Sequence, residues 1–483
     1  MAACNKQSHE PFAAIFPVTL AISALLVIAG LAVDGPMAAL RGLYGIITQP
    51  DLLISDYVAT SGVGAAMLNA GLVTGASVLV LKLSRDPFNG FSIVTVGLML
   101  GFSFFGKNIA TMWPFVLGSW LCTKVTGYSF ADYASVGLMS SSLSPLVSYM
   151  ALGSVYASIP LGIFVGMLVG FIMPVLSPYT YRIQNGMNLY NVGFASGLMA
   201  MMIVPVLTAL GDSPPTALHW SEGWDRWLLG FILLSSLVSL AAGLFFCKRP
   251  AGEVLRQYRE LLGTTGRTPS DYLRMFGFAP SLVNMGVNGL FCLLVLFAIG
   301  GDLNGPTAGA IISIMGFSAW GKHLRNMMPL MLGVILGSTV LHFSIRDPAL
   351  QIAVFFVTTL APVSGHFGWP FGLLTGFIHS ALVLQTSGPV SGLNLYNNGF
   401  SGGLITIVCV PVAAAIFNHH LPKIRDASFF EVLEDELIEE EDWDMKETGY
   451  LHPFHTDPEA ERAFEQEPGH VHEKEETAPS GDK

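Results

Sequence analysis

The chain carries the same long pattern twice, once in each half. Residues 186–205 read GMNLYNVGFASGLMAMMIVP and residues 392–411 read GLNLYNNGFSGGLITIVCVP, with eleven of twenty positions identical. A second block, GFSFFGKNIATMWPFVLG at 101–118, is matched by GFSAWGKHLRNMMPLMLG at 316–333 at nine of eighteen positions. The copies are 206 residues apart in the first block and 215 in the second, so the two halves are collinear. The fold must therefore contain the same unit twice.

The composition indicates that this unit folds in a lipid bilayer. Of 483 residues, 52% are hydrophobic and 12% are charged, which is about half the charged share of an ordinary soluble protein. A bilayer is crossed by about 20 apolar residues in a helix. The clearest runs of about that length are 12–33, 61–83, 152–175, 226–247, 276–299 and 400–418. Because backbone in hydrocarbon must satisfy its own hydrogen bonds, these runs predict an all-α integral membrane protein.

The formal net charge of −11 is concentrated at the C-terminus. Residues 426–483 hold twenty acidic and four basic side chains, whereas the preceding 425 residues hold fourteen acidic and nineteen basic ones. This predicts a slightly basic membrane body followed by an acidic, disordered tail in the cytoplasm. The sequence has no basic patch, nucleotide-binding loop or zinc-type cysteine spacing. We therefore expect no nucleic acid, no cofactor and no metal.

The basic residues predict that the two repeats have opposite orientations. Lysine and arginine in short loops favour the cytoplasmic side. The loop 248–275 holds six of them, whereas the corresponding stretch 34–60 holds only Arg41 against three aspartates. One leading helix and six further crossings in each inverted repeat give about 14 transmembrane helices, with both termini in the cytoplasm. Lys107 and Arg346 do not fit this topology.

The duplication divides the chain into two repeats and a tail. The predicted parts are repeat 1 over 1–225 (leading helix 12–33, repeat core 57–211), repeat 2 over 226–425 (leading helix 226–247, cytoplasmic loop 248–275, repeat core 276–418) and the acidic tail 426–483. The predicted spans 91–106, 110–125 and 306–320 are short. Short spans of this kind indicate re-entrant or broken helices.

The best candidate site is the Asn-Leu-Tyr-Asn element, which follows a glycine and interrupts an apolar run in both repeats. Unpaired backbone at membrane depth is tolerated where it lines a cavity, and amide and hydroxyl groups can hydrogen-bond a polar solute there. Paired sites near the midplane are typical of inverted repeats. The candidate substrate-binding residues are Asn188, Tyr190, Asn191, Asn394, Tyr396, Asn397 and Asn398. Alternatively, the asparagines cap helices and the tyrosines anchor the membrane interface.

Gly106-Lys107 and Gly321-Lys322 form a second repeated pair. Lysine inside hydrocarbon is costly and often marks function, so Lys107 and Lys322 are further candidates. Alternatively, both lie near helix ends and their side chains extend to the interface. The only acids within 60–210 and 276–418 are Asp86, Asp132, Asp302 and Asp347. This composition favours a neutral or anionic solute over a metal cation.

The GFSxxGK and GxNLYNxGFxxGL blocks, over about residues 57–412, resemble an uncharacterised family of bacterial multi-spanning membrane proteins. In that family a domain of unknown function occurs twice. The resemblance implies a location in the bacterial cytoplasmic membrane and implies no substrate. The order of residues from Gly392 to Leu404 is also similar to urea-transporter repeats. The Leu-Pro element of those repeats is only distantly matched, so urea specificity is not implied.

These patterns favour a secondary transporter or channel for a small polar solute, rather than an enzyme. The expected partners are the lipid bilayer, the small-molecule solute and, in a homo-oligomer, a second copy of the chain. One alternative is a membrane receptor or scaffold that signals through its acidic tail. The other is an intramembrane serine hydrolase, because Gly399-Phe-Ser401-Gly402 matches a Gly-x-Ser-Gly pattern. Such an enzyme needs a histidine beside the serine, and no later histidine lies within a predicted span.

Overall fold

The computed structural model describes residues 10–51, 54–215, 217–246 and 249–420. The predicted acidic tail lies outside these residues. The first half contains α1 (Glu10–Val33), α2 (Pro36–Thr48), β1 (Ile54–Ser55), α3 (Tyr57–Ser61), α4 (Val63–Ser84), α5 (Gly90–Phe102), α6 (Trp113–Thr126), α7 (Phe130–Ser140), η1 (Ser141–Leu143), α8 (Ser144–Leu152), α9 (Ile159–Gln184) and α10 (Asn191–Ala209).

The second half repeats this order after a short strand, β2 (Leu218–His219). It contains α11 (Arg226–Ala241), η2 (Ala242–Phe246), α12 (Ala251–Leu261), α13 (Tyr272–Met275), α14 (Phe278–Ala298), α15 (Gly305–Phe317), α16 (Leu324–Val340), α17 (Pro348–Phe356), η3 (Val357–Leu360), α18 (Ala361–Phe367), α19 (Trp369–Thr386) and α20 (Asn397–His420). The predicted leading helices correspond to α1 and α11, and the predicted loop 248–275 contains α12 and α13.

The helices are those of a multi-pass membrane protein. Among the described residues, eight helical stretches are long and apolar enough to cross a membrane. They are Ile15–Val33, Val63–Ser84, Ile159–Gln184, Asn191–Ala209, Arg226–Phe245, Phe278–Ala298, Pro348–Phe367 and Asn397–Ile416. Three further apolar helices, α5, α15 and α16, are shorter. Helix length alone therefore gives eight spans rather than the 14 counted from the sequence.

Corresponding helices of the two halves form corresponding pairs. Within the halves, α1 packs on α4 and α11 on α14, while α6 packs on α9 and α16 on α19. Between the halves, α5 packs on α15 and α10 on α20. A Cβ added at Gly97 in α5 would lie 2.8 Å from the Cα of Gly316 in α15. Small residues at such a crossing let the two backbones approach closely.

The first turns of the short helices α5 and α15 are each hydrogen-bonded to the other half. The side chains of Asn89 and Asn304 form capping boxes at the first turns of α5 and α15. The backbone N–H of Gly90 in α5 donates to Asp271 at 3.0 Å, and the N–H of Gly305 in α15 donates to Asp56 at 3.2 Å. Both contacts cross between the halves. The two halves therefore depend on each other for the positions of their short helices.

The segment that joins the halves is bonded to both of them. β1 pairs in parallel with β2. The backbone N–H of Ser221 donates to Asp56 at 3.1 Å, and the indole N–H of Trp220 donates to Asp302 at 2.9 Å. Residues 218–224 therefore connect the segment of β1 and Asp56 in the first half to the α14–α15 loop of the second.

Candidate functional site

The loops after α5 and α15 place one lysine each inside the protein. Both loops turn at a glycine with φ of +81°, Gly106 and Gly321, a conformation that side chains disfavour. In each loop the backbone N–H of the lysine donates to a carbonyl at the end of the short helix. Lys107 donates to Phe102 and Lys322 to Phe317, both at 3.2 Å. The repeated Gly-Lys dipeptide thus lies in a turn that ends the short helix.

A buried asparagine holds each lysine loop in place. The side-chain N–H₂ of Asn69 donates to the carbonyl oxygens of Ser103 and Lys107, both at 2.8 Å. Asn284 makes the two corresponding bonds in the second half, at 2.8 and 2.7 Å. Because a broken helix leaves carbonyl groups without helical partners, these amides satisfy acceptors that would otherwise be unpaired at membrane depth.

Both lysines are fully buried and donate to tyrosines of the opposite half. Lys107 and Lys322 have no exposed surface. The Nζ atom of Lys107 lies 2.6 Å from the hydroxyl of Tyr396, and that of Lys322 lies 2.5 Å from the hydroxyl of Tyr190. The interpretation that these lysines extend to the membrane interface is wrong, because their side chains end inside the protein on partners 289 and 132 positions away.

The tyrosines lie in the predicted helix breaks. In the first half, α9 ends at Gln184 and α10 begins at Asn191. In the second, α19 ends at Thr386 and α20 begins at Asn397. Backbone of the opposite half satisfies donors in each break: the Leu189 N–H donates to Thr359 and the Leu395 N–H to Ser142, both at 2.9 Å.

Asn188 and Asn394 join the two breaks to one another. The Asn188 amide donates to the carbonyl of Gly399 at 3.0 Å, and the Asn394 amide donates to the carbonyl of Gly193 at 3.1 Å. Their side-chain oxygens accept from the backbone N–H groups two residues on, those of Tyr190 and Tyr396. The predicted solute ligands Asn188 and Asn394 are thus occupied in contacts between the halves.

The remaining candidate asparagines fasten α10 and α20 to the helices before them. The Asn191 amide donates to the carbonyl of Ser177 in α9 at 2.7 Å. The Asn397 amide donates to the carbonyl of Val383 in α19 at 3.3 Å, and the oxygen of Asn398 lies 3.0 Å from Nε2 of His379. These contacts are structural, but they are not the helix caps of the alternative prediction, because the Asn191 and Asn397 amides donate to carbonyls of the preceding helix.

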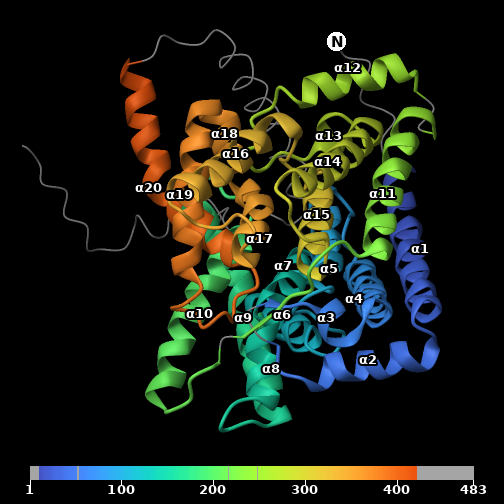
Figure 1. Cartoon of the computed structure of the whole chain (residues 1–483), viewed down its shortest axis with the longest axis vertical. Helices are drawn as coiled ribbons and strands as arrows, with labels where there is room; N and C mark the ends of the chain where they lie inside the picture. The colour runs from blue at the N-terminus through green and yellow to red at the C-terminus, as the bar shows by residue number, and fades with distance from the viewer. Residues whose placement is uncertain (1–9, 52–53, 216, 247–248, 421–483) are drawn as a thin grey trace, which may run out of the picture.

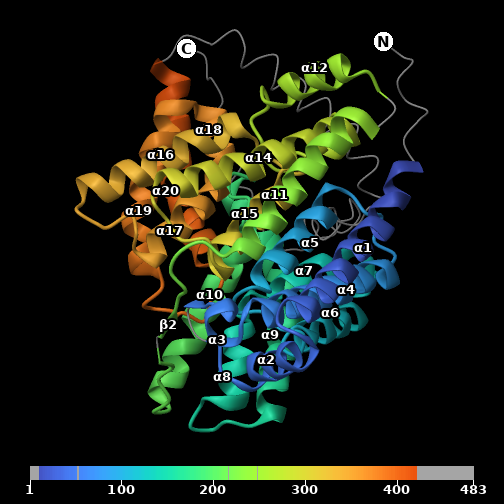
Figure 2. The ribbon, with the colours of Figure 1, turned by 45° about the vertical axis from the view of Figure 1, so that its right-hand side comes forward.

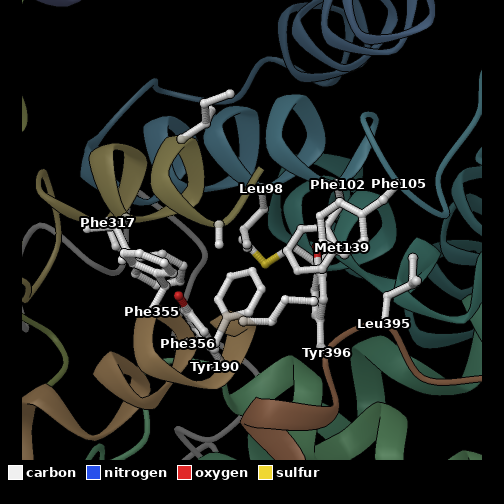
Figure 3. Packing of buried hydrophobic residues seen from close by; sticks show 14 of the residues in the cluster. Leu98, Phe102, Phe105, Met139, Tyr190, Phe317, Phe355, Phe356, Leu395 and Tyr396 are labelled. Atoms are coloured by element: carbon white, nitrogen blue, oxygen red, sulfur yellow. The ribbon is translucent and has the colours of Figure 1, made fainter. Parts of the chain in front are cut away.

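A cavity lies at the breaks, between the two tyrosines. Figure 3 shows Tyr190 beside Phe317 on one side of a hydrophobic cluster and Tyr396 beside Phe102 on the other. Phe356 contacts both Phe102 and Tyr190. The cavity has a volume of about 70 Å³, which is room for several water molecules. Its walls are mostly apolar and also include Asn188 and Asn191, and one edge reaches the loop residues Thr268 and Pro269.

The sequence predictions missed the polar residues of η1 and η3. Thr358 accepts from Lys322 at 2.8 Å, and the hydroxyl of Thr359 donates to the side chain of Asn188. In the first half, the backbone carbonyl of Ser142 accepts from Leu395 in the break that contains Tyr396, and the Ser142 hydroxyl lies 2.6 Å from that of Ser196. A signal was present, since small polar residues precede Leu-Ser-Pro at 143–145 and Leu-Ala-Pro at 360–362. The two prolines mark the points where α8 and α18 begin.

The described residues show neither a metal-binding group nor a serine–histidine pair at the Gly-x-Ser-Gly pattern. No group of three or more His, Cys, Asp or Glu side chains among them is arranged to hold a metal ion. The hydroxyl of Ser401 lies 2.7 Å from that of Thr386 and donates to the carbonyl of Asn397 at 3.1 Å. Its partners in this part of the chain are therefore structural.

Comparison with known proteins identifies the repeated unit. A family model described as protein of unknown function (DUF1576) matches the chain twice, at residues 35–209 and 251–415. Each match covers most of one half. No match was found among curated proteins or among solved structures.

Proposed function

We propose that this chain, which belongs to the DUF1576 family of proteins of unknown function, passes a small polar solute across the cell membrane as a secondary transporter or channel. The proposal rests on one observation above all. Two buried lysine–tyrosine couples, Lys107 with Tyr396 and Lys322 with Tyr190, join opposite halves beside a cavity at paired helix breaks. Paired breaks on facing repeats are typical of solute pathways through membranes.

We infer that the halves have an inverted arrangement, which would support this function. In Figures 1 and 2, α10 runs from the centre to the bottom of the view, whereas α20 runs to the top. Likewise α2 lies at the bottom and α12 at the top. Each half has seven proposed crossings if α7–α8 and α17–α18 each count as one broken helix and α2, α3, α12 and α13 do not cross. This gives 14 crossings. With the basic α12 side in the cytoplasm, both termini are cytoplasmic in this proposal.

The two ends of the proposed pathway differ. On one side the cavity reaches the loop at Thr268 and Pro269, between α12 and α14. On the other side residues 218–224 are hydrogen-bonded to Asp56 and Asp302, across the junction of the halves. We infer a conformation that admits solute from the α12 side. Rocking of the halves would then break the contacts of residues 218–224 and open the opposite side.

A flux assay in proteoliposomes tests the proposal. Urea, glycerol and lactate are offered to vesicles with the full chain, and permeation is compared with that of empty vesicles. We expect at least one solute to permeate faster, and the double variant Tyr190→Phe, Tyr396→Phe to lose most of that increase. Asn191→Ala with Asn397→Ala should reduce it by loosening α10 and α20.

The matched control is Tyr44→Phe, because Tyr44 lies on α2 with 70% of its surface exposed. This variant should transport as the unaltered chain does. Flux that persists unchanged in the double tyrosine variant would show that the solute does not pass the two couples.

A further inference from the structure

The charge balance around the two buried lysines points to the class of solute. The hydrogen-bond partners of Lys107 are the Tyr396 hydroxyl and the sulfur of Met99. Those of Lys322 are the hydroxyls of Tyr190 and Thr358. All four partners are uncharged. The ion pairs Arg256–Glu260 and Arg274–Asp271 do not involve these lysines.

The carboxylates beside the Lys107 loop and at the cavity have other partners. Asp51 accepts from the Tyr57 hydroxyl at 2.7 Å and from the Asn108 amide at 3.4 Å. Asp132 lies at the edge of the cavity and accepts from the Ser129 N–H at 3.0 Å. A buried ammonium group without a counter-charge is costly in a low-dielectric interior. An anion in the cavity would supply the missing charge for either lysine.

The hydroxyl groups have the polarity that an anion requires. An ammonium group can only donate hydrogen bonds. Lys107 and Lys322 therefore donate to the tyrosine oxygens. Each tyrosine hydroxyl can then donate its own hydrogen to a further acceptor, although Tyr190 also has the Thr358 hydroxyl within reach. Tyr190 and Tyr396 border the cavity, and the lysines lie behind them. A solute in the cavity thus meets O–H donors polarised by a cation.

The apolar side chains that line the cavity restrict the class of solute further. Leu98, Phe102, Met139, Phe317 and Phe356 line most of the cavity. Such side chains cannot replace the water shell of a small inorganic anion, but they can pack against a hydrocarbon body. The site thus combines donors for one charged group with an apolar surface for the remainder of the molecule.

We propose that the solute is an organic monocarboxylate. Its carboxylate accepts hydrogen bonds from the Tyr190 or Tyr396 hydroxyl, each supported by the lysine of the opposite half, and its apolar body lies against the phenylalanine wall. This inference rests on the proposed function, because it assigns the solute class of the same site. The pseudo-symmetry offers the carboxylate two equivalent positions, one for each couple.

Binding to the purified full chain tests the charge requirement directly. Benzoate and benzamide, which have the same ring and nearly the same size, are compared by the rise that each causes in the unfolding temperature in detergent. Chloride is the inorganic control. We expect a rise with benzoate and none with benzamide or chloride. Equal effects of benzoate and benzamide, an effect of chloride equal to that of benzoate, or no effect of benzoate would overturn the inference.

Variants then locate the binding site. The double variant Lys107→Gln, Lys322→Gln should weaken benzoate binding about tenfold or more, since neither tyrosine hydroxyl is then hydrogen-bonded to a charged group. Lys124→Gln is the matched control, because Lys124 is exposed on α6. Undiminished benzoate binding in the double lysine variant would also overturn the inference. Because the comparison with benzamide uses the unaltered chain, it remains decisive even if a lysine variant fails to fold.

The two proposals fail separately. If urea or glycerol permeates through the chain and the tyrosine double variant stops it, while benzoate does not bind, the transport function stands and the carboxylate class is wrong. If benzoate binds at the lysines and no solute permeates, the anion site stands and the transport function is wrong.

Discussion

The amine of Lys107 lies 2.6 Å from the hydroxyl of Tyr396, a residue 289 positions later in the chain. The corresponding couple, Lys322 with Tyr190, spans 132 positions in the other direction between the halves. Neither half therefore completes its own couple. Each half supplies a lysine to its partner and receives one in return, as expected of a site at the interface of two repeats.

The crossing of α10 and α20 should not tolerate a side chain. A Cβ added at Gly193 would lie 2.8 Å from the carbonyl oxygen of Tyr396, and one added at Gly399 would lie 2.7 Å from that of Tyr190. Gly193→Ala and Gly399→Ala must push the helices apart, so we expect each to lower the free energy of unfolding by about 1–3 kcal/mol. Thermal unfolding in detergent measures this loss.

A glycine on the helix surface provides the control for these variants. A Cβ added at Gly230 in α11 would meet no atom within 4 Å. Gly230→Ala should leave stability unchanged or raise it by about 0.5–1 kcal/mol, because alanine is the better helix former. Equal effects at all three glycines would show that α10 and α20 are not tightly packed here.

The asparagine amides that hold the lysine loops should be required for both stability and transport. Asn284→Ala removes the donor to the carbonyls of Ser318 and Lys322. Leaving buried acceptors unpaired should lower the free energy of unfolding by about 1–3 kcal/mol, and the freed loop should reduce solute flux. Asn69→Ala should lower the stability and the solute flux in the same way. Gln49→Ala, on an exposed side chain, is the matched control and should change neither quantity.

The proposed inversion predicts which loops share a face of the membrane. Single cysteines at Arg41 in α2 and at Arg256 in α12, both exposed, would be introduced after the five native cysteines are replaced. A membrane-impermeant maleimide added to intact cells should label the Arg41→Cys variant and spare Arg256→Cys until the cells are opened. Labelling of both variants from one side would be incompatible with inverted repeats.

Sequence patterns were sufficient for the features that depend on local composition. The membrane class, the duplication, the leading helices and the breaks before Asn191 and Asn397 were predicted from runs of apolar residues and their interruptions. The roles of single polar residues were harder to predict from the sequence. Asn188 and Asn394 were predicted to bind solute, yet their amides hold the breaks of the two halves together. The hydroxyls of Thr358 and Thr359 were not predicted at all.

By itself, the sequence determined that this chain lies in a membrane, consists of two related halves and interrupts its helices at repeated places. These properties follow from the free-energy cost of exposing polar backbone groups to lipid. Each helix must avoid this cost through its own hydrogen bonds, so the local sequence is sufficient to predict it. Only the tertiary structure decided that each lysine is buried on a tyrosine of the other half. Such pairing depends on how two distant segments pack. Hydropathy is a property of each segment alone, so it does not specify which segments come into contact.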